Sequence, residues 1–268
     1  MAKRETDKAE RNELIVLTAG VAKNLATSLD ESWKDRHPDT PLDIKMGGSL
    51  KLANEIRSGK PCDVYISADI TLMEQLLEEG LIEEYQVWAS NALVIAGEDI
   101  TSENWMDRLL DPESNFGHTN PNLDPGGYRS AMALKMAEDI RPGFYDEIEK
   151  HPGYIGVNLI PKADEGKVKP QYEITYLTKA KDAGENYAHL PSEIDFSDPD
   201  FSDDYEAAYF DLEDGSRIYG SLIRHGIAIP KASAHPKEAA DYVKQFMALD
   251  FEAKGFLPLG RDEDDWVD

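Results

Sequence analysis

Cysteine is almost missing from this sequence: Cys62 is the only one among 268 residues. A single thiol forms no intramolecular disulfide, and it cannot supply a cysteine cluster for zinc or an iron–sulfur group. Because Cys62 lies between Pro61 and Asp63, we expect it to be a small core residue. The sequence also lacks any run of about 18 apolar residues, so no segment is predicted to cross a bilayer.

Basic residues are scarce, with 28 Lys and Arg against 53 Asp and Glu, which gives a formal net charge of −25. Nucleic acids and anionic membranes bind to basic patches, so neither is an expected partner. An anionic ligand would be repelled at long range and must be recognised by local donors, although salt screens this repulsion beyond about 8 Å. A salt-rich habitat and plain solubility both remain open as explanations of the charge.

The first twelve residues are rich in charges and lack the apolar run of a signal peptide. We expect residues 1–12 to form a polar tether. If the protein is exported, its signal segment has been removed from this chain; if Met1 is the natural start, the protein is intracellular.

Short apolar runs alternate with helical patterns in the first eighty residues. The expected strands are residues 13–17, 41–46 and 63–67, and the expected helices are residues 21–33, 49–58 and 70–79. This alternation predicts a parallel sheet covered by helices on both faces. Ligands of such sheets bind at the carboxyl ends of the strands, where the turns collect.

The rest of the chain predicts a second domain inserted into the first. The expected strands are residues 88–96, 171–177 and 227–230, with a hairpin at 210–219. The expected helices are residues 102–110, capped by Thr101 or Ser102, and residues 128–140, 143–150 and 236–250. A turn is expected at 162–169, a solvated acidic segment at 195–206 and an acidic tail at 261–268.

Two chain crossings, near residues 92 and 226, separate the expected domains. Lobe I is predicted to comprise residues 13–93 plus 226–268, and lobe II residues 94–225. Two crossings make a hinge, and we expect a small ligand in a cleft between the lobes.

A proline- and glycine-rich loop at residues 116–127 precedes the helical pattern that starts at Tyr128. Its backbone N–H groups reach a helix N-terminus, which is a favourable place for an anion. An ordinary Asp-Pro turn before a helix is the alternative interpretation.

Residues 121–129 read Pro-Asn-Leu-Asp-Pro-Gly-Gly-Tyr-Arg. This pattern resembles the signature of the archaeal-type molybdate/tungstate-binding proteins, the solute-binding components of ABC importers, with Gly126 where that family usually has Cys. The resemblance extends from about residue 13 to about residue 260. It implies an α/β fold of the two-lobed periplasmic-binding-protein-like type II, with mixed sheets flanked by helices and a ligand cleft between the lobes.

The resemblance also implies a function and a set of binding residues. The protein would capture tungstate or molybdate outside the cell or in the periplasm, tethered to the membrane, as a monomer with an ABC permease as partner, no cofactor and no catalytic activity. The implied ligand-binding residues are Gly20, Val21, Gly48, Ser49, Asp124, Gly126, Gly127, Asn158 and Tyr176. Asp124 would bind a metal only if it coordinates the metal of the oxyanion directly.

Two of these positions depart from the family pattern. Val21 stands where the family has a serine, and Asn158 stands where the family has a glutamate that coordinates the metal together with the loop aspartate. A hydroxyl and a carboxylate are therefore missing, and binding of a different small anion or ligand remains an alternative.

Each candidate residue also has a purely structural interpretation. Ser49 fits a helix N-cap, Tyr176 a core aromatic residue, and Asp124 a residue that fixes its own turn. Ser67 fits a supporting turn better than a ligand group, and Arg129 fits a salt-bridge partner of a nearby carboxylate better than an anion clamp.

Two other function classes compete with transport. A metal-dependent hydrolase could use His118, Asp124 and His225, but the sequence has no His-x-x-x-His motif, no Glu-His cluster and no activated Ser or Cys motif. A sensor or scaffold without a transporter is the third possibility. Zinc-dependent turnover would favour the enzyme, and tight binding without turnover would favour the binding protein.

Overall fold

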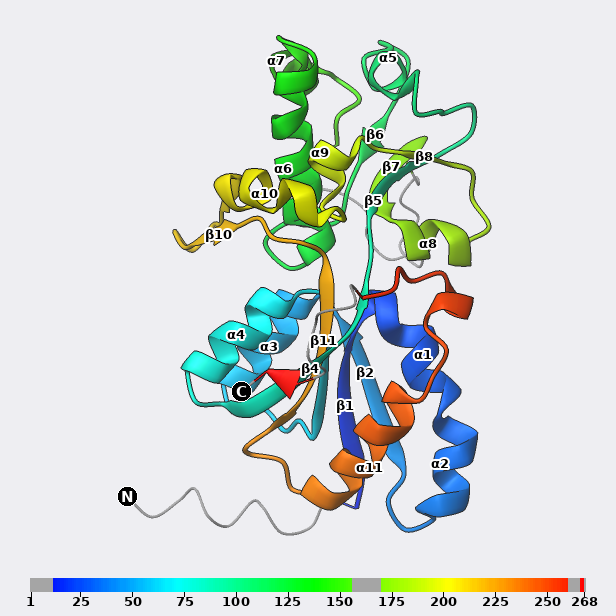
Figure 1. Cartoon of the computed structure of the whole chain (residues 1–268), viewed down its shortest axis with the longest axis vertical. Coiled ribbons are helices and arrows are strands. Elements are labelled where there is room, and N and C mark those ends of the chain that lie inside the picture. The colour runs from blue at the N-terminus through cyan, green and yellow to red at the C-terminus, as the bar shows by residue number, and fades with distance from the viewer. Residues whose placement is uncertain (1–11, 156–169, 260–265, 268) are drawn as a thin grey trace. The chain divides into compact units, whose positions relative to one another are not determined.

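The computed structural model describes residues 12–155, 170–259 and 266–267 of the chain (Figure 1). The chain divides into two compact units: unit 1 comprises residues 1–89, 224–250 and 259–268, and unit 2 comprises residues 90–223 and 251–258. The predicted division assigned all of residues 226–268 to one lobe. The structure differs at residues 251–258 and 90–93, which group with unit 2, and at residues 224–225, which group with unit 1.

Unit 1 contains a mixed sheet with helices on both faces. Its strands are β1 (Leu14–Ala19), β2 (Leu42–Gly47), β3 (Val64–Ser67), β4 (Ile82–Ser90), β11 (Arg224–Pro230) and β12 (Trp266–Val267). Its helices are the 3₁₀ helix η1 (Gly20–Ala22), α1 (Lys23–Ser28), α2 (Asp30–Arg36), α3 (Ser49–Arg57), α4 (Ile70–Glu78) and α11 (Pro236–Met247).

The strand order in this sheet is β12-β4-β11-β3-β1-β2. Strand β1 runs parallel to β2 and β3, so the prediction of parallel pairing is confirmed for these three strands. Strand β11 runs antiparallel to β3, and β12 runs antiparallel to β4. Because β11 enters after the long excursion through unit 2, no short helical crossover forces it to be parallel.

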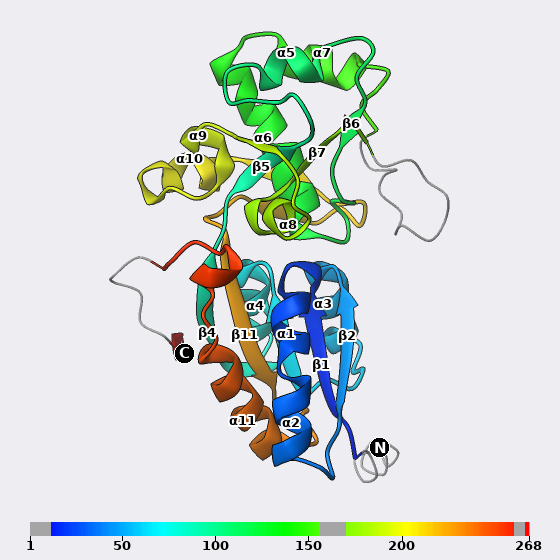
Figure 2. The same ribbon diagram turned by 90° about the vertical axis from the view of Figure 1, so that its right-hand side faces the viewer.

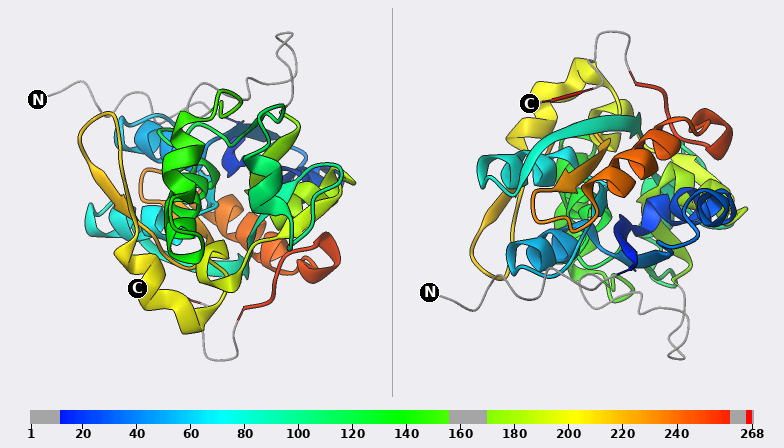
Figure 3. Two further views of the ribbon diagram at one scale, coloured as in Figure 1. Left: turned by 90° about the horizontal axis from the view of Figure 1, so that it is seen from above. Right: turned by 90° about the horizontal axis from the view of Figure 1, so that it is seen from below.

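Helices cover the sheet of unit 1 from both sides. Figures 2 and 3 show α3 and α4 on one face of the strands and α1, α2 and α11 on the other. All six residues of β1 are buried, as a central strand covered on both faces requires. Cys62 is buried in the same core, which confirms its predicted place.

Unit 2 contains a smaller mixed sheet in the order β6-β7-β5-β8 and a separate hairpin. The strands are β5 (Leu93–Ala96), β6 (Phe116–Gly117), β7 (Tyr172–Tyr176), β8 (Tyr187–His189), β9 (Tyr209–Asp211) and β10 (Arg217–Tyr219). The helices are α5 (Trp105–Leu109), α6 (Pro125–Ile140), α7 (Phe144–Lys150), α8 (Leu177–Asp182), α9 (Ser192–Asp195), η4 (Pro199–Phe201), α10 (Ser202–Ala207) and η5 (Glu252–Lys254).

Three predicted elements are divided or shifted. The strand expected at 88–96 is two strands, because the Asn91 side chain turns inward to bond the Ala92 amide and Thr178. The helix expected at 21–33 is interrupted at Leu29, between α1 and α2. The helix expected at 102–110 begins only at Trp105, so the predicted caps Thr101 and Ser102 were wrong: its N-cap position is Asn104.

The acidic segment at 195–206 was predicted to be a solvated surface segment, and the prediction is only partly right: Asp203, Asp204 and Glu206 are exposed, whereas Asp195, Phe196 and Tyr205 are buried. The segment contains helical turns, and Tyr205 is fully buried. The rings of Phe196 and Tyr205 pack with their centroids 4.8 Å apart. The two aromatic side chains therefore anchor the segment in the core of unit 2, which its charges alone did not predict.

Other predictions are confirmed or lie outside the described residues. The hairpin around Asp214 and Gly215 forms as expected, with Gly215 at a φ of +86°, which a glycine adopts without strain. Residues 162–169, Asn158 and most of the expected terminal segments lie outside the described residues. Among the described residues, no helix combines the length and the hydropathy of a membrane span.

Candidate functional site

The first two candidate turns in unit 1 follow neighbouring parallel strands. Ala19 at the end of β1 pairs in register with Gly47 at the end of β2. The turns at Gly20 and Gly48 therefore leave the same edge of the sheet, as the sequence predicted. Gly20 is exposed, and an added Cβ there would meet no atom within 4 Å, so packing does not require glycine at this position. The next residue, Val21, is half-buried.

Ser49 is the first residue of α3, and Gly48 occupies the N-cap position without a side-chain cap bond. The alternative that Ser49 is itself an N-cap is therefore wrong. The buried Ser49 Oγ accepts a hydrogen bond of 2.9 Å from the Ala68 amide. Since a hydroxyl that accepts one bond can still donate its proton, Ser49 joins the turns after β2 and β3 and keeps its capacity as a donor.

Ser67 has the supporting role that the sequence favoured. Its Oγ accepts from the Asp69 amide at 3.1 Å and donates to the Asp69 carbonyl at 2.8 Å. Asp69 in turn caps α4 by accepting from the Thr71 amide. This turn is closed by its own hydrogen bonds.

The central loop enters α6 three residues earlier than predicted, at Pro125. Asp124 is the N-cap: its Oδ1 accepts from the Gly126 amide at 2.8 Å and from Thr119 Oγ1 at 3.3 Å. The Gly127 amide donates to the Asp124 carbonyl at 3.0 Å. Both amides expected to bind an anion thus already donate to Asp124 in this structure.

The two glycines of this turn differ in what surrounds them. A Cβ at Gly127 would lie 2.4 Å from the Thr119 carbonyl oxygen and 2.6 Å from the Pro121 nitrogen, so only glycine fits. A Cβ at Gly126 would lie 3.0 Å from Asp124 Oδ1 and 3.5 Å from the Tyr176 ring. Gly126 therefore lies between two of the predicted binding side chains.

Tyr176 ends β7 directly before α8 and is 6% exposed. Its hydroxyl accepts a hydrogen bond of 3.1 Å from Nη1 of Arg129, and Nη2 of Arg129 donates to Ser221 Oγ at 3.2 Å. Arg129 lies in the second turn of α6 and is 1% exposed. From the sequence, Arg129 was expected to pair with a carboxylate, and Ser221 was not predicted to belong to the site. Only the fold brings these segments together.

The charge state of Asp124 matters for any anion in its neighbourhood. Burial raises the pKa of the Asp124 carboxyl above its ordinary value, while the Gly126 hydrogen bond, the charge of Lys179 and the Thr119 hydroxyl act in the opposite direction. A raised pKa lowers the fraction of Asp124 that is negatively charged at a given pH. The repulsion between Asp124 and an anion is correspondingly smaller.

The residues considered for a metal-dependent hydrolase do not form a metal site. Burial lowers the pKa of His118, whose two ring nitrogens contact the Thr119 carbonyl at 2.8 Å and the Tyr154 hydroxyl at 2.9 Å. His225 belongs to unit 1 and stacks on Trp88, whereas His118 and Asp124 belong to unit 2. Within the described parts of the chain, no three His, Cys, Asp or Glu side chains are grouped to hold a metal.

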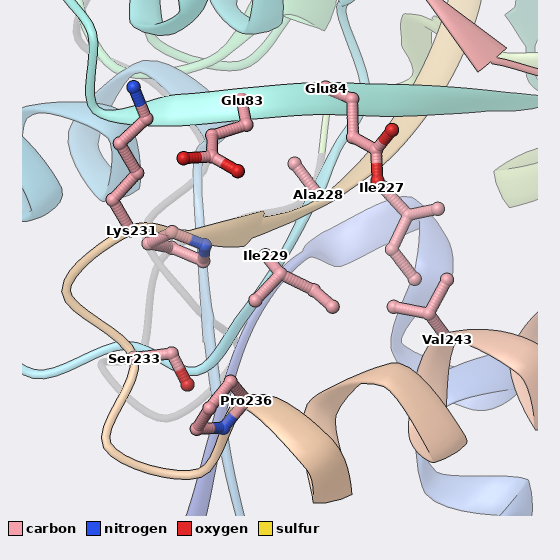
Figure 4. Close-up of a pocket in the computed structure, with 10 residues that line it drawn as sticks. Glu83, Glu84, Ile227, Ala228, Ile229, Lys231, Ser233, Pro236 and Val243 are labelled. Carbon is pink, nitrogen blue, oxygen red and sulfur yellow. The ribbon is translucent and has the colours of Figure 1, made fainter.

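A hollow of about 370 Å³ in unit 1 contains none of the predicted site residues. Figure 4 shows Glu83 and Glu84 of β4 above it, with Ile229 of β11 and Val243 of α11 along its wall. Its lining carries two carboxylates against the single ammonium of Lys231, a net negative charge that repels an anion. This hollow is therefore not a candidate for the predicted ligand.

Comparisons with known proteins agree with this organisation. Residues 14–248 match the family model described as bacterial extracellular solute-binding protein. A Methanoculleus marisnigri protein named an uncharacterized solute-binding protein is 28% identical, with 89% of this chain and 78% of that protein covered. The molybdate/tungstate-binding protein WtpA of Pyrococcus abyssi is 25% identical, with 90% and 82% covered.

Among solved structures, the periplasmic molybdate-binding protein of Azotobacter vinelandii has the same fold. The TM-score is 0.68 at 15% identity, and the match covers 92% of this chain and 100% of that chain. At this identity the likeness establishes the fold alone. The predicted periplasmic-binding-protein-like α/β fold with mixed sheets is confirmed.

Proposed function

The chain belongs to the bacterial extracellular solute-binding proteins, and we propose that it captures an oxyanion, tungstate or molybdate, and delivers it to an ABC permease. The observation that carries this proposal is the arrangement in unit 2, where the Tyr176 hydroxyl is held by the buried Arg129 of α6. The Tyr176 ring also lies beside Gly126. Gly126 belongs to the motif at residues 121–129, which resembles that of oxyanion-binding proteins. The name of the relative WtpA supports the choice of ligand.

A buried oxyanion needs several donors, because a bare dianion in an apolar environment is very unfavourable. Each charge-assisted hydrogen bond contributes about 1.5–3 kcal/mol, so four to six of them support a micromolar or tighter dissociation constant. We propose that Tyr176, Ser49 and the turns at Gly20 and Gly48 supply donors. Asp124 holds the N-terminal turn of α6 in place.

The departures at Val21 and Asn158 affect the form of the bound anion. With no hydroxyl at Val21 and no carboxylate at Asn158, we propose that neutral donors hold the anion as a tetrahedron. Asp124 would be a metal ligand only if it coordinates the metal of the oxyanion directly, and its Oδ1 already accepts from the Gly126 amide. A different small anion stays as the alternative ligand.

Membership in the family supports a location outside the cell or in the periplasm, and we propose the remaining features. The protein acts outside the cell or in the periplasm, tethered to the membrane and as a monomer, and it needs no cofactor. It carries out no chemistry on its ligand, since the relatives named above are binding proteins. Its signal to the permease is a shift of population toward a ligand-bound conformation.

A thermal-shift panel with tungstate, molybdate, chromate, sulfate and phosphate tests the proposal. A ligand that binds only the folded state at one hundred times its dissociation constant stabilises that state by about 2.7 kcal/mol. We expect tungstate or molybdate to raise the melting temperature of the wild type and to raise that of Tyr176→Phe by less. No response to any of the five anions would overturn the oxyanion assignment while leaving the family assignment intact.

A further inference from the structure

Arg129 connects three separate segments of unit 2. It projects from α6, and its guanidinium donates to Tyr176 at the end of β7 and to Ser221 in the segment before β11. The Nη1–Oη distance is 3.1 Å and the Nη2–Oγ distance is 3.2 Å. A guanidinium is always charged and presents its N–H groups in a fixed plane. The two hydroxyls are therefore held in a defined geometry.

The buried position of Arg129 gives these bonds their importance. The side chain is 1% exposed, and a charge removed from water is stabilised only by hydrogen bonds and nearby opposite charge. Two of its N–H groups are used to hold the hydroxyls of Tyr176 and Ser221. In a chain with a net charge of −25, this charge is placed beside a predicted anion-binding tyrosine.

The direction of the Arg129–Tyr176 bond determines how the phenol acts. Because Arg129 has only donors, the Tyr176 oxygen must be the acceptor in this bond. The phenol proton then points away from the guanidinium, and the adjacent positive charge makes the O–H group a stronger donor. Ser130, the residue after Arg129, bonds the Gly126 carbonyl and keeps the start of α6 in place.

We propose that Arg129 is a positioning residue for anion binding: it holds the Tyr176 hydroxyl as a polarised donor toward the ligand and does not contact the ligand itself. This inference rests on the proposed function. Oxyanion affinity then depends on two residues: Tyr176 binds the anion, and Arg129 orients the Tyr176 hydroxyl.

A double-mutant cycle measured by titration calorimetry with tungstate and molybdate tests this role. The variants are Tyr176→Phe, Arg129→Met and the combination of both, and Arg141→Gln serves as the control. Arg141 is an exposed arginine of the same unit, paired with Asp107, so its replacement changes the net charge equally. Far-UV circular dichroism and melting temperatures establish that each variant is folded.

We expect Tyr176→Phe and Arg129→Met each to weaken binding by about 10- to 100-fold, the loss of one charge-assisted hydrogen bond. The double variant should bind no more weakly than the weaker single variant, because both changes remove one contact. Arg141→Gln should stay within about twofold of the wild type. If Arg129→Met does not fold, Arg129→Gln replaces it in the cycle with the same expectation, since a neutral amide lacks the charge that polarises the phenol.

Two results would overturn the inference while leaving the proposed function intact. Wild-type affinity in the Arg129 variants would mean that Arg129 has a structural role only. Losses that multiply in the double variant would mean that Arg129 acts on the anion independently of Tyr176. If the wild-type protein binds neither tungstate nor molybdate, the proposed function and this inference are both contradicted. Titration of the wild type gives this result before any variant is measured.

Discussion

At the scale of single residues, Asp195 is a buried acid that the sequence pattern placed in solvent. The residue is 7% exposed, and its carboxylate accepts hydrogen bonds from the amide and the hydroxyl of Ser197. Burial raises the pKa of Asp195 from its ordinary value to about 6, in spite of these two bonds. A carboxyl group with a raised pKa favours the folded state only while it is protonated.

The pH dependence of stability should therefore contain a contribution from Asp195. The pKa of Asp195 is higher in the folded protein than in the unfolded chain. Its stabilising contribution to the free energy of unfolding is therefore complete below about pH 4 and is lost as the pH rises through about 6. Denaturant titrations at pH 4 to 8 should show that the stability of the wild type relative to Asp195→Asn falls by on the order of 2 kcal/mol across this window. A constant difference between the two proteins at all pH values would contradict the assignment.

Asp63 is a second buried acid, and it joins segments distant in sequence. Its Oδ2 accepts from the Ile15 amide, and its Oδ1 accepts from Ser233 Oγ and the Ala234 amide, each at 2.9 Å. Strand β1 and the loop before α11 are thus connected through one carboxylate. The sequence offered no indication of this role, since the partners lie 48 to 171 positions away.

Replacement of Asp63 should be costly, because it leaves buried amides without an acceptor. Asp63→Ala is expected to lower the free energy of unfolding by about 3 kcal/mol, whereas Ser233→Ala, which removes one of the donors, should lower it by about 1 kcal/mol. Chemical denaturation of the wild type and both variants measures these changes in the free energy of unfolding. Equal effects of the two substitutions would show that Asp63 has no such connecting role.

At the scale of elements, the start of α6 is the most constrained turn of the candidate site. Two glycines follow Asp124 and Pro125, and they have different reasons to be glycine. At Gly127 an added Cβ would meet backbone atoms of the preceding loop at 2.4–2.7 Å, whereas at Gly126 it would meet side-chain atoms at 3.0 Å or more.

This difference predicts unequal effects of the same substitution at neighbouring positions. Gly127→Ala forces the loop away from α6 and should destabilise the protein by about 1–3 kcal/mol or more. Gly126→Ala should change stability by less than about 1 kcal/mol, because helix propensity offsets the close contact. Thermal unfolding measures the stability of both variants. A similar loss of stability at both positions would show that the preceding loop moves to accept the Cβ at little energetic cost.

The elements also show what a sequence can and cannot predict. Strands β1 to β3 and helices α3 and α4 were predictable, because their apolar periodicity is local and their turns contain glycine or a capping side chain. The separation of β4 from β5 at Asn91 was not predictable, since it depends on the contact of Asn91 with Thr178, 87 positions away. The motif at 121–129 indicated the position of α6, but the Arg129–Tyr176–Ser221 contacts arise only when three distant segments meet.

At the scale of the whole molecule, the excess of negative charge is the dominant property. A net charge of −25 on 268 residues creates self-repulsion that opposes the compact state, and salt screens this repulsion. We expect the melting temperature to rise by at least about 3 °C between 0.05 and 1 M NaCl, the shift that about 1 kcal/mol produces in a chain of this size.

A charge-reduced variant provides the control for this expectation. Asp203, Asp204 and Glu206 are exposed on α10, and Asp203→Asn/Asp204→Asn/Glu206→Gln removes three negative charges. The variant should respond less to NaCl than the wild type, and KCl should act like NaCl. A melting temperature that does not depend on salt would mean that the charge serves solubility alone.

Binding of a metal oxyanion is tested most directly by isothermal titration calorimetry of the wild-type protein with tungstate and molybdate, with sulfate and phosphate as competitors. We expect one oxyanion per chain, a dissociation constant in the micromolar range or below, and affinity that decreases in Ser49→Ala and Tyr176→Phe. Absence of binding to both metal oxyanions, or equal affinity for phosphate, would contradict the assignment of a tungstate or molybdate carrier to this fold.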